Sequence, residues 1–66
     1  MDTRLKLVNE REACSLLGLS RAYLALLRMR AEGPRYAKIG KAVRYDVADL
    51  AAWVENRKRG GEGDAK

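Results

Sequence analysis

Basic side chains are concentrated in the middle of the chain, where their density fits the binding of a polyanion. Seven basic residues lie between Arg21 and Tyr45, with Glu32 as the only acid, which gives this segment a balance of +6. Residues 46–56 carry −3, and residues 1–20 are balanced. A surface that is merely soluble mixes its signs, so this segregation predicts an electrostatic footprint for a polyanion; a solvated charged surface is the plainer alternative.

The composition argues against an enzyme and against a metal centre. The chain has 66 residues, no histidine and a single cysteine, Cys14. A domain of this length buries about 60% of its unfolded surface, which leaves little room for a cofactor and a substrate. Cys14 stands among Ala13, Leu16 and Leu17 and is expected to be a core residue and not a reactive thiol. We therefore expect no catalytic residues, no metal ligands and no cofactor.

The sequence also lacks the signals of a membrane or secreted protein. It has no run of about 18 apolar residues, which a membrane-spanning helix needs. The opening residues, MDTRLKLVNE, lack the apolar centre of a signal peptide. These features predict a cytoplasmic protein without a membrane partner.

Local capping signals predict two short helices joined by a tight turn. Asn9, with a glutamate three residues later, forms a capping box that predicts a helix over residues 10–17, ended by Gly18. Ser20 repeats the cap and predicts a second helix over residues 21–31. A three-residue turn that contains glycine is typical of a helix-turn-helix, although two helices of a bundle can use so short a link.

A third helix is predicted near the end of the chain. Asp46 can cap it, and apolar residues at helical spacing extend it over residues 47–57. Trp53 is expected to be the main core anchor. Residues 58–66 begin with basic residues, are then rich in glycine and lack large apolar side chains, so we expect a disordered tail.

Between Pro34 and Asp46 the apolar residues alternate, which predicts a β-hairpin. One side of the hairpin is expected to pack on the helices and carries Ala37, Ile39, Val43 and Tyr45. The other side is expected to face solvent and carries Tyr36, Lys38 and Arg44. This arrangement requires a three-residue loop over residues 40–42, since a two-residue turn would put Ile39 and Val43 on opposite sides. Such a hairpin would be a wing.

The order of these motifs resembles a known family. The motifs are the LLGLSRAYL turn, the EGPRY exit, the KIGKAVRY hairpin and the DLAAWV helix, which together span residues 8–54. They resemble the small excisionase and AlpA-like proteins of phages and mobile elements, which share a MerR-like winged helix-turn-helix fold. The resemblance implies a mainly α domain with a β-hairpin wing over residues 1–57, in the order helix, turn, helix, hairpin, helix.

In that fold the second helix enters the DNA major groove, and the resemblance assigns candidate DNA contacts to it. The candidates on this helix are Ser20, Arg21, Ala22, Ala25, Leu26, Arg28 and Arg30. Arg21 can bind a guanine edge or a phosphate. Leu26 stands where members of the family often carry a basic or polar residue. Together with Ala22 and Ala25 it can touch thymine methyl groups, or together with Met29 it can contact another protein. The candidates in the wing are Arg35, Lys38, Lys41 and Arg44.

The resemblance implies one leading function and one alternative. The leading one is an excisionase, or recombination directionality factor, which binds and bends attachment-site DNA cooperatively to promote excision by an integrase. The alternative is a small transcriptional regulator of a mobile element. The implied partners are double-stranded DNA, an integrase and further copies along the DNA, in the bacterial nucleoid. No small-molecule effector is expected, because the effector domain of MerR-type regulators has no counterpart in this sequence. A protein-interaction module without DNA is a third hypothesis, which the +6 balance disfavours.

Overall fold

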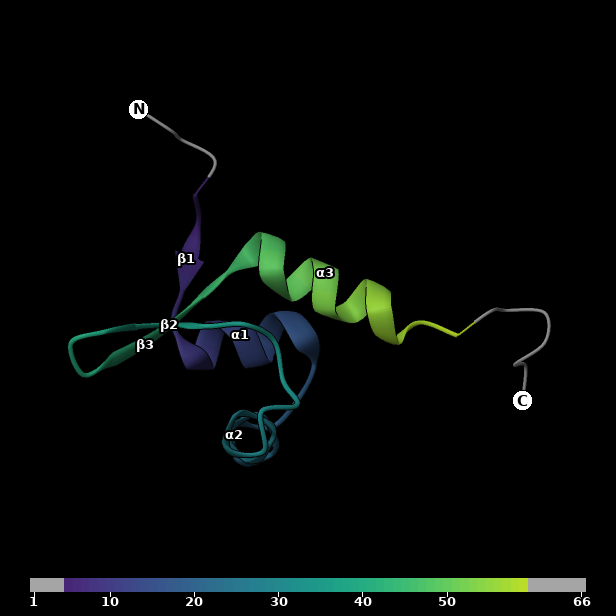
Figure 1. The fold of residues 1–66 in the computed structure, drawn as a ribbon, viewed down its shortest axis with the longest axis horizontal. Coiled ribbons are helices and arrows are strands. Elements are labelled where there is room, and N and C mark those ends of the chain that lie inside the picture. Colours follow the sequence, from purple (N-terminus) through teal and green to yellow (C-terminus); the bar gives the residue numbers. More distant parts are fainter. Residues whose placement is uncertain (1–4, 60–66) are drawn as a thin grey trace.

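Three helices and a three-stranded antiparallel sheet make up the part of the chain that the computed structural model describes, residues 5–59 (Figure 1). The order is β1 (Leu7–Val8), α1 (Glu10–Leu17), α2 (Arg21–Met29), β2 (Ala37–Ile39), β3 (Ala42–Asp46) and α3 (Val47–Arg57). The predicted fold class, mainly α with a β-hairpin wing, is confirmed. Most of the predicted tail at residues 58–66 lies outside the described residues.

The three predicted helix starts are also confirmed, each by its own side-chain cap. The Asn9 side chain accepts a hydrogen bond from the Glu12 amide at 2.8 Å, and the Glu12 carboxylate accepts one from the Asn9 amide at 2.9 Å. Ser20 Oγ accepts from the Tyr23 amide at 3.1 Å, and Asp46 caps α3. Because caps are formed by residues close in sequence, a linear reading finds them.

Strand β1 was not predicted, and it decides where α1 lies. Val8 lies opposite Tyr45 and Leu7 lies opposite Asp46, so that β3 becomes the central strand in the order β1-β3-β2. The backbone oxygen of Lys6 continues this pairing by accepting from the first amide of α3 at 3.0 Å. The pairing brings the start of α1 beside the β2–β3 hairpin.

The predicted three-residue hairpin loop is wrong. Ile39 pairs with Ala42, which leaves a two-residue turn of Gly40 and Lys41. Gly40 has φ 63° and Lys41 is not among the residues with positive φ, the pattern of a type II′ turn with glycine at its first central position. The prediction assumed that Ile39 is buried, but its side chain is 55% exposed, because the hairpin extends beyond the helices (Figure 1).

The corrected register also separates two predicted wing residues. Lys38 lies opposite Val43, and Arg44 lies opposite Ala37. Residues paired directly across a ladder share a side, and neighbours along a strand alternate. Lys38 and Arg44 therefore lie on opposite sides of the hairpin, and the prediction that they share one open side is wrong.

Tyr45 occupies the centre of the core. Tyr45 and Leu24 are the largest fully buried side chains, and Ala13, Cys14 and Leu50 complete the buried cluster. The cluster therefore joins α1, α2, α3 and the central strand. Val8, Leu17 and Val43 pack against its edge.

Trp53 is not the main core anchor, contrary to the prediction. Its side chain is half-buried, and its Nε1–H donates to the backbone oxygen of Glu32 at 3.1 Å. Arg57 donates to the same oxygen at 2.8 Å and lies over the Trp53 ring, 4.5 Å from its centroid. These two side chains fasten the second half of α3 to the loop that follows α2.

Helix α2 ends at Met29, two residues before the predicted end; its cap residue is Arg30, and the next residue, Ala31, is left-handed. The amide of Glu32 donates to the Leu27 oxygen at 2.9 Å, and the amide of Ala31 donates to the Arg28 oxygen at 3.1 Å. These are the two hydrogen bonds of a Schellman motif, which places Ala31 at φ 57°. That conformation favours glycine, so Ala31 is strained.

We expect Ala31→Gly to raise the free energy of unfolding by about 1 kcal/mol, because glycine adopts the left-handed conformation without the Cβ clash. As a control, Ala52→Gly in the exposed middle of α3 should lower it by about 1 kcal/mol through helix propensity. Urea denaturation of both variants measures the difference. A loss of stability in both would contradict the strain at Ala31.

Tyr45 supplies a second stability test, because its buried hydroxyl has no hydrogen-bond partner among the described residues. Tyr45→Phe should raise the free energy of unfolding by about 1 kcal/mol, since it removes a desolvated, unsatisfied hydroxyl while keeping the ring. Tyr36→Phe, at an exposed hydroxyl, should leave it unchanged. A loss of stability in Tyr45→Phe alone, again by urea denaturation, would show that the hydroxyl has an acceptor.

Candidate nucleic-acid interface

The start of α1, the start of α2 and the hairpin meet around an open, polar groove of about 580 Å³. Four cationic side chains and one carboxylate contribute to its walls. The groove is lined by Asn9, Glu10, Arg11, Arg21, Lys41, Val43 and Arg44, and is called the basic groove below. Opposite walls come from elements far apart in sequence, so that an anion in the groove would contact three elements at once.

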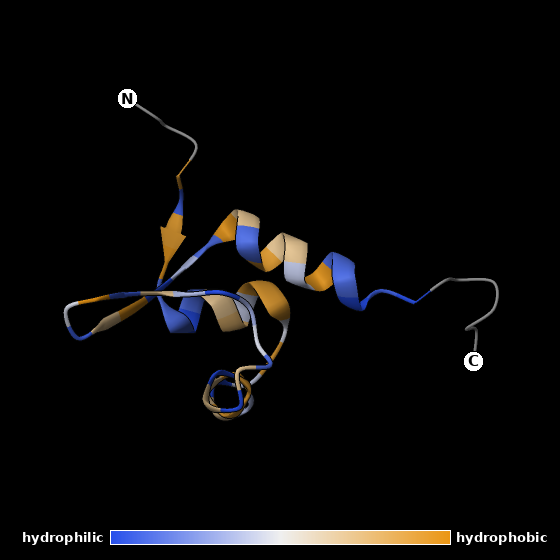
Figure 2. Cartoon of the chain, viewed as in Figure 1, coloured by the Kyte–Doolittle hydropathy of each residue, from blue (hydrophilic) through white to orange (hydrophobic). Residues whose placement is uncertain are grey.

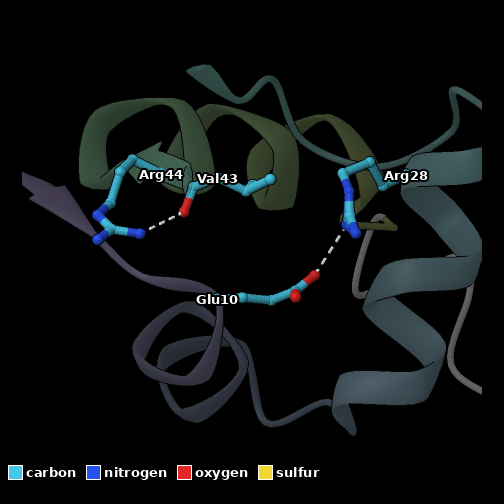
Figure 3. A network of polar contacts seen from close by, with 4 residues as sticks. All are labelled: Glu10, Arg28, Val43 and Arg44. Atoms are coloured by element: carbon cyan, nitrogen blue, oxygen red, sulfur yellow. Dashed lines mark hydrogen bonds and ion pairs between the residues drawn. The ribbon is translucent and has the colours of Figure 1, made fainter. Parts of the chain in front are cut away.

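Each cation of the groove is positioned by a feature of the fold. Arg21 is the first residue of α2, directly after the Ser20 cap, and Lys41 lies at the hairpin tip. Arg44 is half-buried on β3, and its Nη1 donates to the backbone oxygen of Val43 at 2.9 Å (Figure 3). Arg21, Lys41 and Arg44 were predicted site residues, and the structure brings them together.

Arg11 is a groove residue that the sequence analysis missed. It lies in a segment of balanced charge, which gave no reason to select it. Its place in the groove follows from the β1–β3 pairing, which brings the start of α1 to the hairpin. Arg11 could have been identified from the sequence only if the β1–β3 pairing had been predicted.

Glu10 is the one acidic residue that lines the basic groove in the described part of the chain, and it is paired. Nη1 of Arg28 lies 3.0 Å from a carboxylate oxygen of Glu10 (Figure 3). The Arg28 guanidinium also lies 5.9 Å from the centroid of the Tyr36 ring. Arg28, a predicted DNA contact, is therefore held within the protein, between α1 and the segment that precedes β2.

Comparison with known protein families gives a match that covers most of the chain. A family model described as a helix-turn-helix domain matches residues 7–58, most of the chain. The chain belongs to this helix-turn-helix family. It is the family of AlpA and excisionase-like small DNA-binding proteins. None of the curated proteins compared with the chain matches it. Membership of this family supports DNA binding by the protein.

In a helix-turn-helix protein the outer surface of α2 is the part expected to meet base edges. Here that surface is largely apolar: Leu26 is 38% exposed, Met29 is 81% exposed and Ala22 is exposed, whereas Ala25 is half-buried. In Figure 2, α2 is seen end-on and carries both apolar and hydrophilic residues. The predicted apolar stripe is therefore accessible, and it offers few hydrogen-bond donors.

The remaining predicted contacts lie outside the basic groove. Ser20 caps α2 through its oxygen, which leaves its hydroxyl hydrogen free to donate. Arg30 at the end of α2, Arg35 in the loop and Lys38 on β2 are exposed and do not line the groove. Their roles in DNA binding stay predictions.

Cys14 belongs to the core and not to the interface. Its side chain is buried, and burial raises the pKa of the thiol above its ordinary value. The thiol therefore stays protonated near neutral pH, which makes it a weak nucleophile. Within residues 5–59 no group of three side chains could hold a metal ion. No described helix has the length and apolar character that a membrane span requires.

We expect Lys41→Gln to weaken binding to a DNA duplex and to reduce the slope of log K against log salt by about 0.9, the loss of one phosphate contact. Lys6→Gln removes the same charge from a site outside the basic groove and should leave the slope unchanged. Fluorescence anisotropy titrations at several salt concentrations provide the measurement. Equal slopes for the two variants would show that the groove does not bind phosphate.

Proposed function

We propose that this helix-turn-helix protein is an excisionase, a recombination directionality factor that binds and bends attachment-site DNA. The observation that carries the proposal is the basic groove, in which the first residue of α2 and the tip of the hairpin share one cationic surface. A duplex that receives α2 in its major groove would meet the wing on the adjoining backbone. The integrase performs the chemistry, and this protein supplies geometry.

Backbone contacts provide most of the affinity in this arrangement. If Arg11, Arg21, Lys41 and Arg44 each neutralise one phosphate, log K should fall against log salt with a slope of about −3.6. These contacts fix the register of the protein on the duplex but carry no sequence information. Binding by the groove is therefore strong at low salt and only weakly selective.

Sequence preference arises from α2 and from the shape of the DNA. Arg21 can bind a guanine edge with two hydrogen bonds, and Ala22 and Leu26 can touch thymine methyl groups. Because the exposed surface of α2 has few other donors, most of the preference must come from DNA that bends or narrows easily. A protein that selects deformable DNA suits a role in bending it.

A single module of this size covers roughly 600–1,000 Å² of DNA, so one copy alone binds weakly. Useful occupancy then requires several copies side by side or contact with the integrase. The exposed Leu26 and Met29 are available for such contacts where they do not face DNA. We propose that the protein acts in the bacterial cytoplasm, on the nucleoid. We also propose that its winged fold is of the MerR-like form.

The proposal predicts stepwise, cooperative mobility shifts when the protein is titrated onto the attachment site of its element. Bending by the bound copies should appear as position-dependent mobility of permuted fragments. Addition of the protein to the integrase should increase excision and not integration. Lys41→Gln should keep the fold and weaken the contact with the DNA backbone. Each mobility shift should then need a higher concentration of this variant than of the wild type.

One shifted band without bending, and no effect on excision, would contradict the excisionase. Binding to a promoter fragment in the same titration would then support the alternative, a small transcriptional regulator of the mobile element. Both functions use the same interface, so they are distinguished by the DNA site and by the integrase assay.

A further inference from the structure

A cluster of three side chains connects the recognition helix to the rest of the domain at the edge of the basic groove. Glu10 comes from α1, Arg28 from α2 and Tyr36 from the segment before β2. Arg28 contacts Glu10 at 3.0 Å and lies 5.9 Å from the Tyr36 ring centroid. The Tyr36 ring in turn lies 6.2 Å from the ring of Tyr45, in the core. Arg28 therefore fixes α2 to both its neighbours.

We propose that Arg28 is a positioning residue, which neutralises Glu10 inside the basic groove and holds α2 at its angle to the wing, and does not itself bind phosphate. This inference rests on the proposed DNA binding by the groove. It assigns opposite roles to two arginines of the same helix: Arg21 faces the DNA, and Arg28 faces the protein.

The surroundings of Arg28 support this role. The Arg28 side chain is 24% exposed and the Glu10 side chain 20% exposed, so water and salt screen the pair less than they would at an open surface. Figure 3 shows the guanidinium directed at the Glu10 carboxylate. Nη1 of Arg28 is engaged by this carboxylate, so a phosphate at that nitrogen would compete with Glu10, which has no other cation at salt-bridge distance among the described residues.

Glu10 gives the pair its importance for binding. It lines the same groove as Arg11, Arg21, Lys41 and Arg44. Without Arg28, its carboxylate would be a free negative charge among the phosphate contacts, and at such distances a partly sheltered charge is not fully screened. The loss of Arg28 should therefore weaken DNA binding mainly through the charge it uncovers.

The test is a rescue experiment with full-length protein and a generic DNA duplex. Three variants are compared with the wild type: Arg28→Met, Arg28→Met with Glu10→Gln, and Arg28→Met with Glu55→Gln. The last variant is a matched control. Glu55, on α3, pairs with Lys58 and lies outside the groove. Its replacement gives the same net charge as the replacement of Glu10. Anisotropy titrations over a range of salt give the dissociation constant and the salt slope, and circular dichroism shows that each variant is folded.

We expect Arg28→Met to raise the dissociation constant about tenfold, and Glu10→Gln to restore it to within about threefold of the wild type, because the uncovered charge is then removed. The Glu55→Gln control should give no rescue. The rescued variant should keep the wild-type salt slope. If Arg28→Met alone does not fold, the double variant, in which neither partner is left as an unpaired charge, still decides through its slope.

A different pattern would overturn the inference. If Arg28 binds phosphate, the double variant stays weak and its slope falls by about 0.9, as for Lys41→Gln. Rescue by Glu55→Gln as well would show a general charge effect and would equally overturn it. If the wild type binds no duplex even at low salt, the proposed function itself fails and the inference with it.

Discussion

The packing of the buried Tyr45 ring in the core is the interaction on which the rest of the structure depends. Its ring is fully buried on the central strand, where side chains of α1, α2 and α3 converge. One end of that strand leads to the hairpin turn, and the other leads directly into α3. Once the ring is fixed, the direction of the wing, the start of α3 and the pairing with β1 are fixed together. Burial also raises the pKa of the Tyr45 hydroxyl, because the charged form would lose its contact with water.

The basic groove shows that the number of charges in a sequence segment does not identify the residues of a candidate DNA interface. Of the seven basic residues between Arg21 and Tyr45, the structure brings Arg21, Lys41 and Arg44 into the groove, together with Arg11 from outside that segment. Arg28 is used within the protein instead. Whether an arginine is free to bind phosphate depends on its position in the fold. Arg28 is already engaged in the contact between α1 and α2.

What the sequence predicts well is what neighbouring residues decide. The caps at Asn9, Ser20 and Asp46 involve partners within three residues, so that the helices were found at nearly their observed bounds. Most of the errors concern contacts between distant segments, and the end of α2, set by local hydrogen bonds, is the exception. A two-residue strand such as β1 has no periodicity to detect, and without it the place of Arg11 cannot be known. The hairpin register failed because Ile39 was assumed to need burial, whereas the wing tip has nothing to pack against.

The division of the surface has a consequence for how selectivity arises. The cations of the groove are distributed over α1, α2 and the hairpin, whereas the surface of α2 that faces away from the core is apolar at Ala22, Leu26 and Met29. In the proposed function, affinity and readout therefore rest largely on different residues, and Arg21 alone is a candidate for both. The affinity that comes from phosphate contacts depends steeply on salt concentration and little on DNA sequence. A duplex that can deform to meet both the helix and the wing satisfies all the contacts at once, and a stiff one does not. If the proposed function holds, discrimination by deformability follows from this geometry.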